Sequence, residues 1–157
     1  SVLSFGYVNA RGETNIIPDT VQIKGTFRTF DEKWRFLAHE KMKKIARSIC
    51  ESAGGSCDFD IKVGYPYLVN NEQITKTAIC AAEKYLGKEN VITLDLRMTS
   101  EDFAYISQSS PSCFYRIGTS DGKTTKRLHT STFDIDEKVF SISSGLMAYI
   151  TLEQISK

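Results

Sequence analysis

Hydrophobic and polar residues alternate along three segments of the chain, a pattern typical of strands with one buried face. The apolar residues that share a face are Leu3, Phe5 and Tyr7 in the first segment, Val21, Ile23 and Phe27 in the second, and Phe59, Ile61 and Val63 in the third. Between the second and third segments, apolar residues recur at helical spacing from about 32 to 53. We expect Asp31 to cap this helix, and Gly54 with Gly55 to end it.

The order of these elements is strand, strand, helix, strand. It matches the last four elements of a ferredoxin-like layer, whose full order is strand, helix, strand, strand, helix, strand. The chain begins at Ser1, already inside the first predicted strand. We therefore expect residues 1–70 to be an incomplete ferredoxin-like domain in a piece of a longer protein.

The pattern changes after residues 64–71, where a proline and asparagines interrupt regular structure. The elements predicted beyond this boundary are a helix at 72–86, a short strand at 90–93, a helix that starts at Ser100, a buried strand at 113–118, a polar loop at 119–132 and a helix at 136–155. The chain is therefore expected to have an α+β fold, with one domain part over 1–70 and a second over 71–157.

Composition and charge exclude several classes of function. The 157 residues carry a formal net charge of +1, which is too small to attract nucleic acid or an anionic membrane surface. The one basic cluster, Lys123–Arg127, is short and interrupted by threonines, so we predict a solvated loop there. No apolar run approaches the ~18 residues that a membrane-spanning helix needs.

The four cysteines are scattered along the chain and form no C-x-x-C pair. This spacing argues against a zinc knuckle or a thioredoxin-type site. Scattered cysteines in a chain of this size are typical of buried thiols in a reducing compartment, so we expect a cytoplasmic protein.

His129 is the first candidate functional residue, because it lies in a polar loop after a predicted buried strand. Imidazole is a common ligand of zinc and related ions. The alternative is an ordinary loop histidine exposed to solvent. The other histidine, His39, lies among charged residues of the helix predicted at 32–53 and is expected to be a surface residue.

Arg28 and Asn15 are the second candidates. Arg28 lies on the polar face of its strand, where the guanidinium could bind a carboxylate through two parallel hydrogen bonds. Asn15 could add an amide hydrogen bond to the same ligand. The alternative is an asparagine in a turn before Pro18 and a solvated arginine on an exposed sheet face.

Ser100 is the third candidate, within the stretch Met98–Phe103. If a helix starts there, its free backbone N–H groups could bind an anionic group of a ligand. The alternative is a capped helix in which Glu101 and Asp102 only interact with the helix dipole. No residue of this chain is assigned a catalytic role.

Taken together, these segments resemble the metal-dependent amidohydrolases and peptidases of the aminoacylase–carboxypeptidase superfamily. They are most similar to its branch of hippurate hydrolases and indole-acetyl-amino-acid hydrolases. The resemblance covers nearly the whole chain and is carried by four stretches in the family's order: Asn15–Asp19, Gly25–Phe30, Met98–Phe103 and Leu128–Glu137.

The resemblance implies a larger protein in which a ferredoxin-like lid, or dimerisation, domain is inserted into an α/β zinc-peptidase-like catalytic domain. That domain would contain two divalent metal ions, zinc or manganese. His129 would be a metal ligand, and Asn15, Arg28 and Ser100 would bind the substrate. The implied substrate is a small N-acyl amino acid or peptide, and the implied assembly is a homodimer formed through the lid.

Important parts of the family's site are not found in this chain. The metal-binding stretch of Cys-Gly-His-Asp type, the paired glutamates and the upstream lid histidine are absent. We therefore expect the fragment to be inactive alone and to hold no metal. The alternative function is a stand-alone ferredoxin-like dimerisation or ligand-binding module without catalysis.

Overall fold

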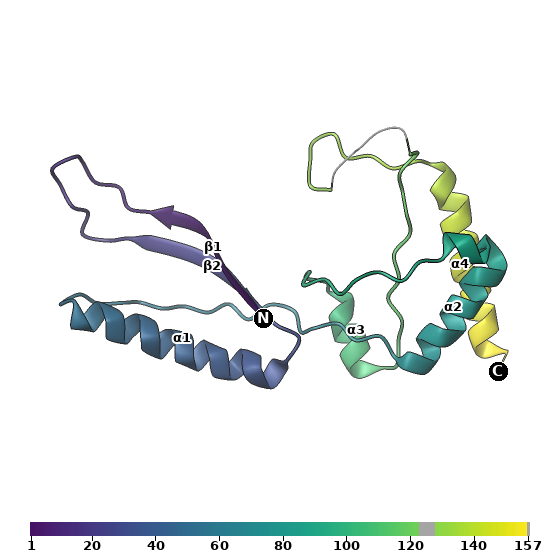
Figure 1. Ribbon diagram of the computed structural model, residues 1–157, viewed down its shortest axis with the longest axis horizontal. Helices are drawn as coiled ribbons and strands as arrows, with labels where there is room; N and C mark the ends of the chain where they lie inside the picture. Colours follow the sequence, from purple (N-terminus) through teal and green to yellow (C-terminus); the bar gives the residue numbers. More distant parts are fainter. Residues whose placement is uncertain (123–127, 157) are drawn as a thin grey trace. The chain divides into compact units, whose positions relative to one another are not determined.

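The computed structural model describes residues 1–122 and 128–156. The elements of this part of the chain, labelled in Figure 1, are β1 (Val2–Asn9), β2 (Gln22–Arg28), α1 (Glu32–Ser52), α2 (Glu72–Leu86), the 3-10 helix η1 (Lys88–Asn90), α3 (Phe103–Ser109) and α4 (Lys138–Ile155). The basic cluster Lys123–Arg127 lies outside the described residues.

The chain folds into two compact units. The first contains Ser1–Tyr67 and Leu96–Glu101, and the second contains Leu68–Asp95 and Asp102–Lys157. The short segment Leu96–Glu101 therefore belongs to the same compact unit as the β-hairpin and α1, although it is distant from them in sequence. The division into a lid part over 1–70 and a catalytic part over 71–157 stays a prediction.

The first unit is built on an antiparallel hairpin of β1 and β2. The pairing runs from Val2 opposite Arg28 to Asn9 opposite Gln22, and a bulge shifts the register between Phe5 and Tyr7. Two of the three predicted strands are thereby confirmed as elements.

The predicted buried face of the first strand is wrong. Leu3, Phe5 and Tyr7 are 49%, 64% and 43% exposed, and Ile23 on β2 is 57% exposed. A two-stranded sheet with one helix beside it has too little neighbouring chain to cover the hairpin. The well-buried apolar residues of the described chain are few and mostly small: Ala38, Ala78, Ala81, Ala104 and Leu146.

Helix α1 begins and ends where the sequence predicts. The side chain of Asp31 accepts a hydrogen bond from the Trp34 N–H at 3.0 Å, which satisfies one free donor of the first turn. At the other end, Gly54 has a φ of 78°, a left-handed conformation that costs glycine no steric strain. The chain then turns back, and the Gly55 N–H donates to the Cys50 carbonyl at 2.9 Å.

His39 of α1 is half-buried, which corrects the prediction of a surface residue. Its ring meets the rings of Phe27 and Phe36 edge-on, at centroid distances of 6.3 and 6.0 Å. Burial, and then the positive charge of Arg35, lower the pKa of His39 below its usual value. The histidine therefore contributes to the packing of α1 on β2.

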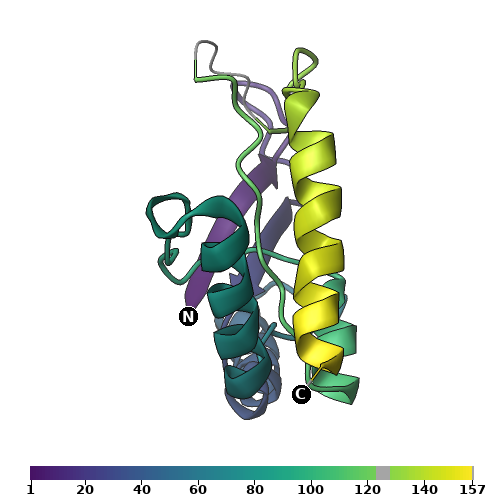
Figure 2. The ribbon, with the colours of Figure 1, turned by 90° about the vertical axis from the view of Figure 1, so that its right-hand side faces the viewer.

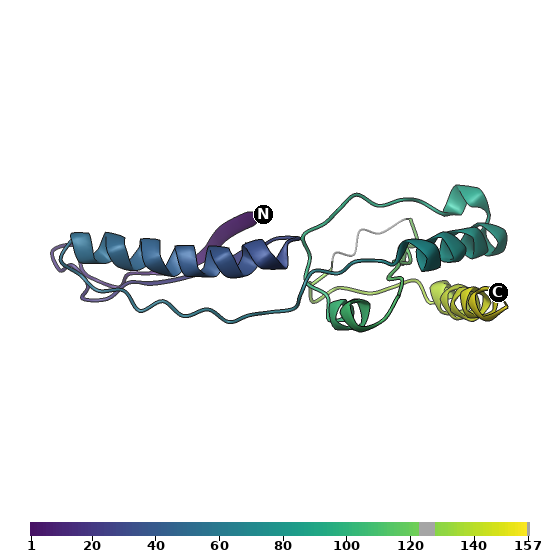
Figure 3. The ribbon, with the colours of Figure 1, turned by 90° about the horizontal axis from the view of Figure 1, so that it is seen from below.

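The third predicted strand is an extended segment without a strand partner in the described part of the chain. It follows α1 and runs back along that helix, as the views in Figures 1 and 3 show. Phe59 and Ile61 are half-buried and their neighbours in sequence are exposed, as the alternation predicts, but Val63, the third residue of the predicted buried face, is 57% exposed. The alternation indicates which side chains face the helix, but a strand also needs a neighbouring backbone.

Arg35 and Glu32 attach the end of this segment to the first turns of α1. The two side chains form an ion pair. Arg35 also donates to the Tyr65 carbonyl at 2.9 Å, and Glu32 accepts from the Tyr67 N–H at 3.3 Å. The guanidinium charge of Arg35 is thus neutralised within the fold.

Helices α2 and α4 lie side by side in the second unit (Figure 2). The rings of Tyr85 and Tyr149 meet with centroids 5.6 Å apart, and the Tyr149 hydroxyl donates to Glu153 at 2.9 Å. That hydrogen bond is the main cause of the raised pKa of Tyr149. Both helices were predicted within two residues of their observed bounds. None of the described helices is long and apolar enough to cross a membrane.

Two strands and one helix start were predicted wrongly in the second half of the chain. Among the described residues, neither 90–93 nor 113–118 forms a strand, and η1 ends where the first of them should begin. Helix α3 begins at Phe103 and not at Ser100. The first of these runs is largely exposed, with Ile92 at 75%, and in the second the backbone of Phe114 bonds to a side chain and not to a strand.

Asn70 supplies such a partner for the segment predicted as a strand at 113–118. Its side-chain amide donates to the Phe114 carbonyl at 2.9 Å and accepts from the Phe114 N–H at 2.8 Å. The neighbouring Asn71 caps α2, accepting from the Ile74 N–H at 3.0 Å. These two asparagines have distinct structural roles at the start of the second unit.

We expect Asn70→Ala to destabilise the protein more than Asn71→Ala does. The first substitution leaves the N–H and the carbonyl of Phe114 without partners, which should lower the free energy of unfolding by about 2–3 kcal/mol. The second removes one N-cap and should cost about 1 kcal/mol. Urea unfolding followed by circular dichroism measures both. Equal losses of unfolding free energy in the two variants would contradict the role of Asn70 as the hydrogen-bond partner of the Phe114 backbone.

Candidate functional site

Arg28 lies at the end of β2, half-buried and paired opposite Val2. Its Nη1 atom donates to the Met98 carbonyl and to the Ser100 hydroxyl, each at 3.0 Å. Both acceptors belong to Leu96–Glu101, the segment that packs into the first unit. The structure therefore brings together two of the predicted site residues, Arg28 and Ser100, from positions 72 residues apart in the chain.

The charge of Arg28 is not neutralised by an acidic partner in the described residues. Its two recorded acceptors are a carbonyl and a hydroxyl, and the ion pairs of the described chain do not include it. Arg35 in the same unit differs, because Glu32 pairs with it. A half-buried guanidinium held by neutral groups keeps its full charge for an anionic ligand.

Ser100 does not cap a helix. The N-cap of α3 is Asp102, and neither its side chain nor that of Ser100 accepts a capping hydrogen bond from α3. The expectation of an anion site at a helix start on Ser100 is therefore wrong. The exposed hydroxyl of Ser100 bonds to Arg28 instead.

Asn15 lies at the opposite end of the hairpin from Arg28. It is exposed in the turn closed by the reciprocal backbone hydrogen bonds of Glu13 and Ile16, both 3.1 Å long. The six residue steps from Gln22 to Arg28 alone span about 20 Å, and Asn15 lies beyond Gln22. Within one copy of the chain, a small ligand cannot contact both Asn15 and Arg28.

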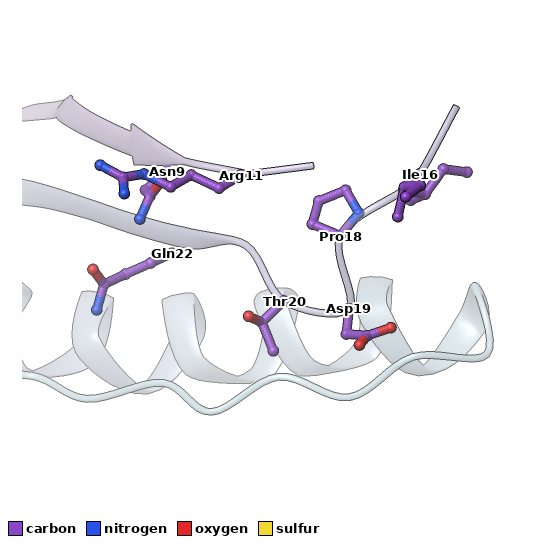
Figure 4. Close-up of a pocket in the computed structure, with 8 residues that line it drawn as sticks. Asn9, Arg11, Ile16, Pro18, Asp19, Thr20 and Gln22 are labelled. Atoms are coloured by element: carbon purple, nitrogen blue, oxygen red, sulfur yellow. The ribbon is translucent and has the colours of Figure 1, made fainter. Parts of the chain in front are cut away.

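A shallow hollow of about 400 Å³ lies at this turn end of the hairpin (Figure 4). It is lined by Asn9, Arg11, Ile16, Ile17, Pro18, Asp19, Thr20 and Gln22. Arg28 and Ser100 are not part of its lining. The hollow is therefore separate from the group that contains the available guanidinium.

His129 lies in the second unit, in a turn that the chain makes before α4. The base of its loop is closed by the Asp136 N–H, which donates to the Thr119 carbonyl at 3.0 Å. His129 is exposed and has a φ of 62°, and in the described chain it is the one residue other than glycine with a positive φ. Such a conformation costs on the order of 1–3 kcal/mol and is frequent at functional sites.

The described residues do not form a complete metal site. No group of three or more His, Cys, Asp or Glu side chains in that part of the chain is arranged to hold an ion. A protein metal site needs three or four such ligands, and His129 is one candidate among them. A metal bound through His129 would therefore need ligands from outside the described residues.

Some important partners escaped the sequence-based predictions. The Met98 carbonyl bonds to Arg28 from a position 70 residues later, and the amide of Asn70 pairs with Phe114 over 44 residues. A backbone carbonyl carries no signal in the sequence. For Asn70, the one available signal was a polar residue before a capped helix.

Known proteins of similar sequence and structure are hydrolases by name. The chain is 29% identical over 160 residues to thermostable carboxypeptidase 2 of Saccharolobus solfataricus, covering 99% of this chain and 40% of that protein. It is 37% identical over 139 residues to the N-acetyl-L-cysteine deacetylase of Bacillus subtilis, covering 87% of this chain and 32% of the relative. The chain thus spans about two fifths or less of the length of these relatives.

A solved structure has the same fold over nearly the whole chain. It is that of the Bacillus subtilis YXEP protein, described as a dinuclear metal binding peptidase from the M20 family, with a TM-score of 0.76 and 28% sequence identity. The match covers 95% of this chain and 40% of that protein. The expected resemblance to metal-dependent amidohydrolases and peptidases is confirmed. The model of peptidase family M20/M25/M40 matches residues 6–152, and the chain therefore belongs to this family.

Proposed function

We propose that this chain is part of a metal-dependent hydrolase that cleaves the amide bond of N-acyl amino acids or small peptides. The observation that carries the proposal is Arg28, whose charge is left available by the neutral Met98 carbonyl and Ser100 hydroxyl. A guanidinium of this kind suits the free carboxylate of an amino acid. The relatives named for an N-acetyl amino acid and for carboxypeptidase activity support this class of substrate.

His129 is proposed as one metal ligand. Its imidazole is exposed on a backbone conformation that only a few residue types adopt readily, histidine among them. The name of the YXEP protein, a dinuclear metal binding peptidase, supports two divalent ions in the complete protein. Zinc or manganese would suit an imidazole ligand. When bound, such ions polarise the scissile carbonyl and generate hydroxide near neutral pH.

The remaining parts of the proposal concern assembly and location. The exposed apolar residues of the hairpin, such as Phe5 and Val8 at 64% and 65%, support a homodimer formed through a ferredoxin-like lid. Asn15 would then contact a substrate bound by the other copy, since it cannot reach one at Arg28 of its own chain. Four free cysteines support a reducing, cytoplasmic location.

The test of this proposal uses the full-length protein and an N-acetyl amino acid. We expect hydrolysis that a chelator abolishes and that added zinc or manganese restores. The present chain alone should be inactive, because its described residues hold no complete set of metal ligands. Activity of the full-length protein that survives chelation would contradict the metal-dependent mechanism. Hydrolysis by the isolated chain would contradict the proposal that the other metal ligands lie outside it.

A further inference from the structure

We infer that Ser100 acts on the substrate through Arg28 and is a positioning residue for that guanidinium, an inference that rests on the proposed binding of the substrate carboxylate. The Ser100 hydroxyl accepts from Arg28 Nη1 at 3.0 Å, and the Met98 carbonyl accepts from the same atom at 3.0 Å. The two acceptors come from one short segment, two residues apart. They bind one nitrogen of the guanidinium and define the plane of the group.

The chemistry of guanidinium explains why this arrangement matters. The group has five N–H donors in a rigid planar fork, and two of them belong to Nη1. With Nη1 occupied by Met98 and Ser100, the donors on Nε and Nη2 remain for another partner. In the described chain, no recorded hydrogen bond uses Nε or Nη2 of Arg28. These two atoms form an edge that can bind a carboxylate bidentately.

Both acceptors of Arg28 Nη1 are neutral, so the Nε and Nη2 edge keeps the positive charge that binds an anion. An acidic residue at position 100 would orient the guanidinium equally well but would neutralise it, as Glu32 does for Arg35. A hydroxyl orients the group without cancelling its charge. Without the Met98 carbonyl or the Ser100 hydroxyl, the guanidinium of Arg28 could rotate. Binding a carboxylate would then cost additional side-chain entropy.

The kinetic test compares Ser100→Ala with Ser100→Thr in the full-length enzyme. Ser100→Ala should raise KM for an N-acetyl amino acid about three- to tenfold with little change in kcat, because a guanidinium that is free to rotate must lose side-chain entropy, about 0.5–1.5 kcal/mol, when it binds the carboxylate. Ser100→Thr keeps the hydroxyl and should restore the original KM. The matched control is Ser52→Ala, whose hydroxyl only bonds to the Ile49 carbonyl of its own helix. An unchanged KM in Ser100→Ala would overturn the inference.

A double-substitution cycle separates positioning from direct contact with the substrate. In an Arg28→Ala background, Ser100→Ala should have no further effect on KM, because the residue it positions is gone. If Ser100→Ala raises KM equally in both backgrounds, the hydroxyl contacts the substrate directly and the positioning role is overturned. If Arg28→Ala alone leaves KM unchanged, the failure lies with the proposed carboxylate binding.

If Arg28→Ala leaves KM unchanged, a measurement without substrate still tests the positioning role of Ser100. Nitrogen-15 NMR of the Arg28 side chain reports rotation about its guanidinium bonds. We expect slow rotation in the wild-type protein and in Ser100→Thr, and faster rotation in Ser100→Ala. Equally fast rotation in all three proteins would overturn the positioning role, whatever the substrate.

Discussion

Replacing His129 with asparagine should abolish hydrolysis by the full-length enzyme and lower its metal content. Even the loss of an outer partner of a metal ligand reduces metal affinity or activity about 10- to 100-fold, so loss of a ligand itself should exceed that range. Asparagine is chosen because His129 has a φ of 62°. Asparagine tolerates this left-handed conformation, so the substitution removes the imidazole while the turn is kept.

The matched control for this experiment is the other histidine. His39 packs between Phe27 and Phe36, and its ring has no proposed contact with metal. His39→Asn should therefore lower the free energy of unfolding but leave metal content and kcat unchanged. Metal content measured by mass spectrometry, together with turnover, distinguishes the two variants. A His129→Asn enzyme with full metal content and normal kcat would contradict the proposed ligand.

Helices α1, α2 and α4 were predictable because their signals are local. The Asp31 and Gly54 boundaries of α1 follow from a capping side chain and from a residue that adopts positive φ, both readable within a few positions. The bounds of α2 and α4 follow from apolar residues at helical spacing in the same way.

The strand predictions were wrong where a strand depends on a partner that is distant in sequence. The segment that contains Phe59 and Ile61 buries these two side chains as the alternation predicts, yet Val63 is exposed and no strand pairs with the segment in the described residues. In the run at 113–118, the backbone of Phe114 bonds to the Asn70 side chain and not to a strand. Periodicity is a property of one segment, whereas pairing depends on another segment far away in the sequence.

The candidate site shows the same difference between local features, which the sequence reveals, and contacts between distant segments, which it does not. Arg28 could be proposed as a carboxylate-binding residue from its place on the polar face of a strand, and that role stays a prediction. Its partner group was not predictable, because the Met98 carbonyl and the Ser100 hydroxyl approach it across 70 and 72 residues. The sequence analysis placed Asn15 and Arg28 on the same ligand. In the structure they lie at opposite ends of the β1–β2 hairpin, about 20 Å or more apart.

Arg28→Ala should mainly weaken binding of substrates that carry a free carboxylate. Hydrogen bonds to charged groups contribute about 1.5–3 kcal/mol, which corresponds to an increase in KM of about 10- to 100-fold. The carboxamide analogue of the same N-acetyl amino acid should show little change. Arg28→Lys should recover only part of the loss, because an ammonium is a point charge and cannot bind a carboxylate through a planar fork.

Arg35→Ala is the matched control for the role of Arg28, because both arginines belong to the first unit and differ in their partners. Arg35 is paired with Glu32 and bonded to the Tyr65 carbonyl, so its loss should reduce stability without changing the preference for carboxylate over carboxamide. Steady-state kinetics with both substrates separate these outcomes. Equal and mild effects of Arg28→Ala and His129→Asn would contradict both assigned roles, since one should change KM and the other should abolish turnover.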